Sequence, residues 1–318
     1  MVKGNFDLPF SGARQMRQPV HVFYAGAHLF RPDIVEKVST VALRALASFE
    51  TPYRKQVEAK LRAEPIEDYR IDFEDGYGDR RPDEEQADAY RCGKILAAGV
   101  GLPCVGIRIK RGGIQTLRTF LDSLGTMPPN FRVTVPKVEN PEEVALVAAE
   151  CPGAHIEALI ETAPVLRRLH EIPADSLHLG PYDLMASLGI PAAFQNLNHS
   201  TCTMVRMQML ATGKTVVDGP TKTLPVGDNP QLGWQRHRED IWRSLSEGFY
   251  QSWDIHPAQL VSRYATLIEF YMVHLPAVRE RLANFEGTAT RLGAQFDDAA
   301  TMRGLRAFAE RAAYLVSR

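Results

Sequence analysis

Polar and charged side chains stand at or just past the ends of several short apolar runs in this chain. They are Tyr24, Glu74 with Asp75, Arg108, Lys137, Glu161, Asp183, Asp218 and His256. A charged group at the end of a buried strand costs desolvation free energy unless it is paired or binds a metal ion. The repetition of this pattern therefore indicates one shared polar site.

Two of these carboxylates are candidate metal ligands. Glu161 closes the run IEALI, and Asp183 stands in LGPYDLMASLG, between a short strand and an apolar helix. Carboxylates held close together repel, which raises the pKa of one of them unless a divalent cation neutralises them. Oxygen-only ligation by few protein groups suits Mg²⁺, or Mn²⁺ in its place, rather than zinc. The alternative is that Asp183 caps a helix and Glu161 pairs with a nearby Arg or Lys.

Two cations are candidates for anion binding. Arg108 lies in GIRIK at an inward strand position, where its planar fork could hold a substrate carboxylate or a developing enolate oxygen. The open alternative is a buried ion pair with Glu74 or Asp75. Lys137 in TVPKVEN is either a cation of the site or an exposed residue after a strand.

The pair Glu74 and Asp75 in IDFEDGYG supplies two consecutive carboxylates after the second predicted strand. One of them could accept a hydrogen bond from a metal-bound water, although Asp-Gly is also an ordinary turn pair. We assign both to the catalytic group with Arg108 and Lys137.

Three further residues are candidates for substrate binding. They are Tyr182, which precedes the predicted metal ligand, Asp218 in TVVDGP and His256 in DIHPAQL. A His before Pro at a helix start can equally be a local cap.

The segments between these residues alternate short β-branched or aromatic runs with longer amphipathic stretches, a pattern typical of βα units and a parallel sheet. Strands are predicted at 20–25, 68–73, 104–109, 131–137, 156–161, 176–180, 214–219 and 252–256. Helices are predicted at about 32–63, 83–98, 113–124, 140–150, 235–247 and 257–285, with a capping box formed by Asn140 and Glu143 at the fourth. The polar segment 191–213 reads as an active-site loop or lid.

Eight strands, each followed by a helix, predict an α/β fold of the (β/α)₈ TIM-barrel type. We place the catalytic barrel at residues 1–275 and a C-terminal helical extension at 276–318. The apolar positions of the extension include Leu305, Phe308, Ala312 and Leu315, and they would pack either on its own barrel or on that of a neighbouring subunit. A doubly wound open sheet is the second possibility, but AGAHLF after the first strand is a poor phosphate-binding turn.

The composition is that of an ordinary soluble globular protein. The 318 residues carry 37 Lys and Arg against 38 Asp and Glu, with 45% hydrophobic and 24% charged residues. This composition excludes a disordered or collagen-like chain, and the missing basic excess argues against nucleic acid as the partner. Four widely spaced cysteines suggest neither a zinc site nor a disulfide framework. Without a secretory or transmembrane pattern, we expect no membrane association and a cytoplasmic protein.

Six motifs in order resemble those of the aldolase and citrate lyase β-subunit superfamily (HpcH/HpaI), which includes malyl-CoA lyase. They are IDFEDGYG, GIRIK, VPKVENPEEV, ALIETAP, HLGPYDLMASLG and GFYQSWDIHPAQL, across about residues 68 to 260. The resemblance implies a Mg²⁺-dependent lyase or aldolase that makes or breaks a carbon–carbon bond beside a 2-oxo acid such as pyruvate, glyoxylate or oxaloacetate.

The resemblance also implies roles for individual residues. Glu161 and Asp183 would hold the metal, Arg108 would bind the substrate's oxo and carboxylate oxygens, and Glu74 would contact a metal-bound water. The metal and Arg108 would then stabilise an enolate without a covalent lysine intermediate. A small 2-oxo acid or acyl-CoA would be the partner, and the assembly would be a homo-oligomer, a trimer or hexamer.

The chain departs from the superfamily near its C-terminus. Lyases acting on CoA esters usually carry an Asp-Gly pair where this chain has Leu292 and Gly293, although Asp297 and Asp298 lie close by. This departure shifts the expected substrate from CoA thioesters toward free acids. Two alternatives are a malyl-CoA-type thioesterase and a non-catalytic barrel that binds a metal or metabolite.

Overall fold

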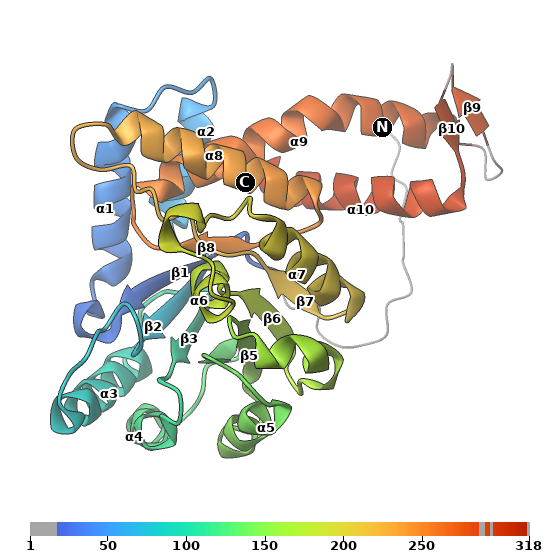
Figure 1. Cartoon of the computed structure of the whole chain (residues 1–318). Helices are drawn as coiled ribbons and strands as arrows, with labels where there is room; N and C mark the ends of the chain where they lie inside the picture. The colour runs from blue at the N-terminus through green and yellow to red at the C-terminus, as the bar shows by residue number, and fades with distance from the viewer. Residues whose placement is uncertain (1–17, 286–289, 293–294, 317–318) are drawn as a thin grey trace.

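Eight parallel strands form a barrel in the computed structural model, which describes residues 18–285, 290–292 and 295–316 (Figure 1). The strands are β1 (His21–Gly26), β2 (Asp68–Asp72), β3 (Cys104–Arg108), β4 (Phe131–Val135), β5 (His155–Ile160), β6 (Ser176–Leu179), β7 (Thr215–Val217) and β8 (Ser252–Asp254). Each lies within, or overlaps, a predicted strand. The predicted barrel fold is therefore confirmed.

The barrel closes between its seventh and eighth strands. The neighbours run in the order β7, β6, β5, β4, β3, β2, β1, β8. A single parallel bridge between Asp218 and Ser252 joins the two ends, and the Asp218 amide donates to the Gln251 carbonyl at 2.9 Å. This order is that of a barrel and excludes the doubly wound sheet.

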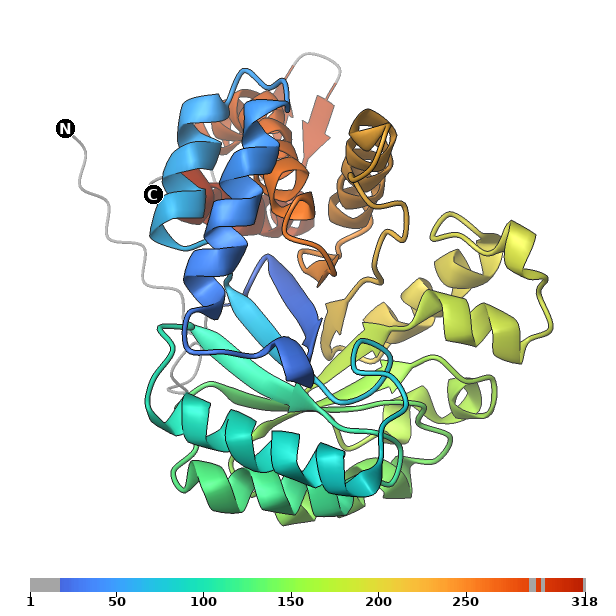
Figure 2. The same ribbon diagram turned by 90° about the vertical axis from the view of Figure 1, so that its left-hand side faces the viewer.

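In the described residues, ten α-helices surround the barrel or extend from it. They are α1 (Ile34–Ala47), α2 (Arg54–Ala63), α3 (Pro82–Ala97), α4 (Ile114–Leu124), α5 (Pro141–Glu150), α6 (Pro181–Ser187), α7 (Ser200–Ala211), α8 (Pro230–Ser246), α9 (Gln259–Asn284) and α10 (Ala299–Val316), with short 3₁₀ turns at Ala27–Leu29, Pro164–Glu171 and Ala192–Phe194. The first two lie beside α9 (Figure 2). None of the helices in the described ranges has the length and apolar character that a bilayer crossing requires.

The prediction of one helix over 32–63 is wrong, because α1 and α2 are separated by residues 48–53. Pro52 has no N–H to donate, and it disfavours helical backbone at Thr51. The Arg54 side chain bridges the break by donating to the carbonyls of Leu46 at 2.8 Å and Phe49 at 2.7 Å.

The prediction that 191–213 is a loop or lid is also wrong for most of its second half, which forms helix α7. The His199 ring caps this helix by accepting the Thr201 amide at 3.2 Å. The buried side chains of α7 include Cys202, Val205 and Met209, whose helical spacing anchors it to the barrel.

The predicted capping box at α5 does not form. The helix starts at Pro141 as expected, but the Asn140 side chain makes no capping hydrogen bond. The Glu143 carboxylate instead accepts the Glu139 amide at 3.3 Å. Its other contact, an ion pair with Arg111 at 2.9 Å, holds the carboxylate toward a neighbouring loop.

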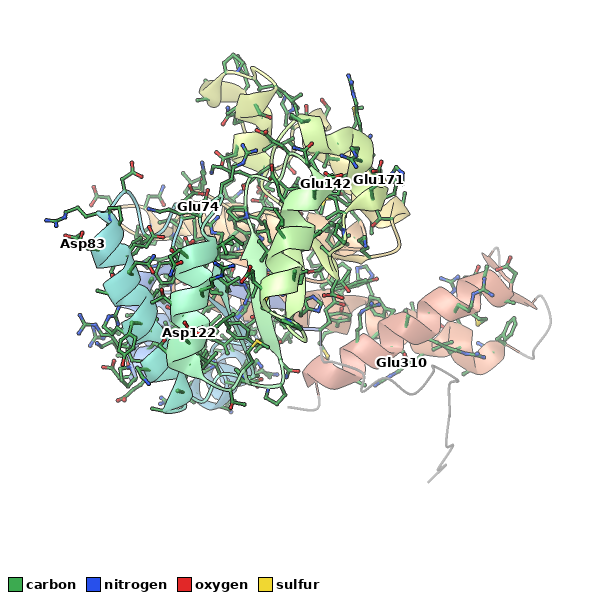
Figure 3. The ribbon with its side chains drawn as sticks, turned by 90° about the horizontal axis from the view of Figure 1, so that it is seen from below. Glu74, Asp83, Asp122, Glu142, Glu171 and Glu310 are labelled. Carbon is green, nitrogen blue, oxygen red and sulfur yellow. The ribbon has the colours of Figure 1, made fainter. Side chains whose placement is uncertain are left out.

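The C-terminal part contains more than the predicted helical extension. Helix α9 runs through Pro276, and an unpredicted antiparallel pair, β9 (Thr290–Leu292) and β10 (Gln295–Asp297), precedes α10. The α9–α10 pair projects from the barrel in Figure 3, where Glu310 marks α10. Phe308 packs on Tyr271 of α9 with ring centroids 5.0 Å apart, so α10 packs on its own chain. The division at residues 275 and 276 and the oligomeric state stay predictions.

Side chains of the strands alternate between two environments. Outward residues such as Tyr69 and Ile71 join the large apolar core beneath the helices. The apolar cluster inside the barrel is small and consists of Val22, Tyr24, Leu159, Val217 and Trp253. Much of the remaining interior is polar and charged.

The interior charges form a buried network around Arg70. Its guanidinium lies 2.9 Å from Asp68 and 2.9 Å from Glu157. Burial opposes the charge on Glu157, but Arg70 holds the pKa of that carboxyl well below its usual range. Gly106 makes room for this arrangement, since a Cβ there would lie 2.7 Å from an Arg70 Nη1 and 2.2 Å from the Arg132 carbonyl oxygen.

Candidate metal and substrate site at the barrel mouth

Six of the predicted site residues meet at the C-terminal end of the barrel, where β2 to β6 deliver them. They are Glu74, Asp75, Arg108, Lys137, Glu161 and Asp183. In Figure 3, Glu74 lies at the end of the barrel where Asp83 begins α3, and Asp122 near the end of α4 lies at the opposite end. We call these six residues the mouth cluster.

Lys137 lies at the centre of the mouth cluster. Its ammonium is 2.5 Å from a Glu74 oxygen, 2.9 Å from Asp183 and 3.6 Å from Asp75. Its backbone has the left-handed φ of 49°, and its amide donates to Glu161 at 2.6 Å. Burial alone would lower the pKa of Lys137, but its hydrogen bonds to Glu74 and Asp183 raise it. The ammonium therefore stays protonated among the acids.

Arg108 is held by an acid that the sequence analysis missed. Asp72, the last residue of β2, accepts hydrogen bonds from Nε and Nη2 of Arg108, both at 2.6 Å. The remaining nitrogen, Nη1, lies 2.9 Å from Glu74. The Asp72 carboxylate thus fixes the guanidinium at two points, and Nη1 is the atom that points toward the mouth cluster.

Asp72 could have been noticed in the sequence from its position. It follows Asp68 and Arg70 at alternating places of a buried strand, so all three face the barrel interior. It also accepts the Glu74 amide at 2.9 Å and the Gly76 amide at 2.7 Å, which shapes the turn that carries Glu74.

Negative charge exceeds positive charge at this site. The acids are Asp72, Glu74, Asp75, Glu161 and Asp183, and the cations in contact with them are Arg108 and Lys137. Glu161 is 3% exposed, and burial, followed by the negative charge of Glu74, raises its pKa to about 7. Burial raises the pKa of Glu74 as well. A divalent cation would relieve this repulsion.

The donor set fits a hard divalent cation with few protein ligands. In the described part of the chain, no group of three or more His, Cys, Asp or Glu side chains is arranged to hold a metal by itself. Glu161 and Asp183 could supply two oxygen ligands, and water or substrate would supply the others. Mg²⁺ is usually bound in proteins in this way. Gly180 keeps the space beside Glu161 open, because a Cβ there would lie 2.5 Å from its carboxylate oxygen.

The raised pKa of Glu161 predicts a pH dependence of stability in the metal-free protein. Its folded pKa of about 7 lies above its usual 4.5, so the folded state holds the extra proton between these values. Relative to Glu161→Gln, the wild type should therefore lose about 2 kcal/mol of unfolding free energy between pH 5 and pH 8. Urea denaturation of both proteins in EDTA measures this difference. If the difference in unfolding free energy between the two proteins were the same at pH 5 and pH 8, the raised pKa of Glu161 would be contradicted.

The other three predicted residues make none of these contacts. Asp218 is fully buried, where it accepts hydrogen bonds from Arg206 at 2.9 Å and from Ser244 at 2.5 Å. The Nδ1 of His256 accepts the Ala258 amide at 3.2 Å, which is the local cap, and burial lowers its pKa. The structure does not bring these two into the mouth cluster, and their roles in substrate binding stay predictions.

Tyr182 lines a cavity of about 570 Å³ between α6, the segment before α7 and the segment after β7. Its hydroxyl donates to the Pro220 carbonyl at 3.3 Å, and the Lys222 ammonium lies 3.8 Å from its ring centroid. The cavity was not predicted, although its polar lining includes Asn196 and Asn198 from the segment singled out as an active-site loop.

Solved structures with this fold include proteins described as a citrate lyase, CitE and a malate synthase. A citrate lyase from Burkholderia xenovorans LB400 is 18% identical, with a TM-score of 0.62 and coverage of 95% of this chain and 93% of that one. CitE from Mycobacterium tuberculosis, in complex with magnesium, acetoacetate and coenzyme A, is 20% identical, with a TM-score of 0.59 and coverage of 92% and 97%. A malate synthase from Haloferax volcanii is 15% identical, with a TM-score of 0.53 and coverage of 78% and 74%.

At these identities the likeness shows the fold, and it is consistent with the resemblance that the motifs indicated. No curated protein sequence matches the chain. One family model does match it, in two segments at residues 2–165 and 161–314, which together span nearly the whole length. The chain therefore belongs to the family described as a domain of unknown function, DUF6986.

Proposed function

We propose that this protein is a Mg²⁺-dependent carbon–carbon lyase or aldolase that acts on a short 2-oxo or hydroxy acid. The observation that carries the proposal is the mouth cluster, in which Glu161 accepts the Lys137 amide and Asp183 contacts the Lys137 ammonium. The Arg108 guanidinium belongs to the same cluster through Glu74. The M. tuberculosis structure holds magnesium, acetoacetate and coenzyme A in a protein of this fold, which supports a magnesium and oxo-acid site here. Mn²⁺ could replace Mg²⁺, since both prefer oxygen ligands.

Glu161 and Asp183 would hold the metal. When bound, Mg²⁺ would polarise the substrate's oxo group and offset the negative charge that develops on its oxygen as the carbon–carbon bond breaks. Arg108 would stabilise the same charge through Nη1, because Asp72 occupies its other two nitrogens and fixes the direction of the third.

Glu74 and Lys137 would orient the substrate and its water. Glu74 lies 2.9 Å from Arg108 and 2.5 Å from Lys137, so its carboxylate stands between the two cations. It would accept a hydrogen bond from a metal-bound water. Asp75 is 61% exposed at the rim and would contact the part of the substrate nearest to solvent.

Free acids are favoured over CoA esters as substrates. The superfamily's C-terminal Asp-Gly position falls on Leu292, whose side chain is outside the described part of the chain, and on Gly293, which is outside it entirely. Of the nearby acids, Asp297 is bound by Arg281 at 3.0 Å, and Asp298 accepts the Thr301 amide at 2.8 Å. Both acids are thus engaged within their own chain, and nothing supports either as a replacement for the missing acid.

Calorimetric titration tests the metal site directly. Mg²⁺ should bind the metal-free protein, and oxalate, a mimic of an enolate, should bind only when Mg²⁺ is present. Asp183→Asn should lower both affinities at least about tenfold, since it removes a charged ligand. The control is Asp122→Asn, an exposed acid on α4 at the opposite end of the barrel, which should bind both as the wild type does.

Turnover separates the lyase from the alternatives. Aldol adducts of pyruvate and glyoxylate should release the free oxo acid in the presence of Mg²⁺ and not in EDTA. Release of CoA from malyl-CoA without an oxo-acid product would favour the thioesterase. Oxalate binding with no turnover on any adduct would favour the non-catalytic barrel, and absence of Mg²⁺ binding would remove the physical basis of the proposal.

A further inference from the structure

The cavity beside the mouth cluster has the features of a second binding site for the substrate. Its volume is about 570 Å³. Tyr182 in its wall immediately precedes Asp183 in the first turn of α6, so the cavity begins one residue from the proposed metal ligand. A substrate held at the mouth cluster could therefore extend into it.

Lys222 gives this cavity a positive charge. Its ammonium lies 3.8 Å from the Tyr182 ring centroid, and the Tyr182 hydroxyl donates to the carbonyl of Pro220, two residues before the lysine. The ring and the lysine are therefore held together. Within the described ranges Lys222 pairs with no carboxylate, whereas Lys137 contacts Glu74, Asp75 and Asp183. A cation fixed on an aromatic ring without an acid partner is suited to an anionic ligand.

The other charges that line the cavity are already engaged. Arg236 pairs with Glu239 at 3.1 Å on the exposed face of α8. The Asp240 carboxylate accepts the Thr221 hydroxyl at 2.7 Å. Among the described residues that line the cavity, Lys222 is therefore the cation without a carboxylate partner.

We propose that this cavity binds a second anionic group of the substrate, a carboxylate or a phosphate, at the end remote from the bond that is made or broken. Lys222 is its counter-charge, and Tyr182 positions the ammonium. This inference rests on the proposed function, and it narrows the substrate from any short oxo acid to one with an anionic distal end.

Binding measurements on the Mg²⁺-loaded full chain test the proposal. The probes are pyruvate, which lacks a distal anion, 2-oxoglutarate and 2-oxoadipate, which carry a carboxylate at two distances, and CoA, which carries phosphates. The wild type should bind at least one anionic probe about tenfold more tightly than pyruvate, and Lys222→Met should lose that advantage while binding pyruvate unchanged. The control is Lys94→Met, another exposed lysine near an aromatic ring, at 5.5 Å from Tyr90 on α3, which should behave as the wild type.

The outcomes separate the two proposals and the two ligand sources. An advantage confined to the oxo diacids identifies a carboxylate, and one confined to CoA identifies a phosphate. If no probe binds more tightly than pyruvate, or if the advantage persists in Lys222→Met, the cavity is not an anion site. If pyruvate does not bind with Mg²⁺ but Lys222→Met weakens a diacid or CoA, the cavity proposal stands and the metal-site proposal fails.

Discussion

An Arg108→Lys variant should turn over substrate about 10² to 10³ times more slowly than the wild type, the range found when one preorganised donor to a developing oxyanion is removed. Lysine keeps the charge but lacks the planar fork, so it cannot hold Asp72 at two points and present a third nitrogen toward Glu74. The Mg²⁺ affinity should change little, because Glu161 and Asp183 are untouched. Steady-state kinetics on the adduct found by screening and a Mg²⁺ titration measure the two effects.

The matched control is Arg111→Lys. Arg111 also joins two carboxylates, Glu139 at 2.7 Å and Glu143 at 2.9 Å, but its side chain is 45% exposed and outside the mouth cluster. The turnover of Arg111→Lys should equal that of the wild type. If Arg108→Lys were within about threefold of the control, Arg108 would have no part in stabilising the transition state.

An Arg70→Met variant should lose about 3 to 5 kcal/mol of unfolding free energy, because it leaves Asp68 and Glu157 charged and uncompensated inside the barrel. Methionine fills much of the same space, so the loss reflects charge more than packing. The measurement is urea denaturation at neutral pH, with the free energy extrapolated to water.

Arg111→Met is again the comparison, since exposed ion pairs contribute about 0 to 1 kcal/mol. The contrast isolates burial, because both arginines join two carboxylates. Equal losses in the two variants would mean that the interior network contributes no more than a surface pair, and the description of the barrel interior as electrostatically held would be wrong.

The sequence was sufficient to group the residues of the mouth cluster because they all lie at or just after the ends of strands. In parallel strands, residues that follow the carboxyl ends gather at one end of a barrel, wherever they lie in the chain. Glu74 and Glu161 could thus be grouped from local pattern alone, without knowledge of the contacts that each makes with Lys137.

The partner of Arg108 could not be predicted in the same way. Asp72 and Arg108 are 36 positions apart in sequence, and they meet because the register of β2 on β3 sets them side by side. Register depends on the packing of the whole barrel, which no local pattern determines. The same holds for Arg70 and Glu157, 87 positions apart on strands that are not neighbours.

The misplaced helix boundaries have local causes. Segment 191–213 is rich in Asn, His, Ser and Thr, and these residues weigh against a helix, yet Cys202, Val205 and Met209 supply its buried face. Pro52 is a helix-breaking residue in the sequence, but the amphipathic pattern continues on both sides of it and predicted one helix. In segment 191–213 the burial of an apolar face decided the outcome. At residues 48–53 the backbone restriction of Pro52 decided it.

The barrel has one weakly paired junction, between the ends of its sheet. Every other pair of adjacent strands shares at least three residues in register, whereas the ends of the sheet meet at Asp218 and Ser252 alone. The Arg206 and Ser244 side chains donate hydrogen bonds to the Asp218 carboxylate from outside the sheet. These side-chain contacts stabilise a junction that backbone pairing stabilises elsewhere in the barrel. The cavity wall that bears Lys222 begins only a few residues beyond this junction. The same short segment therefore both closes the barrel and forms part of the cavity wall.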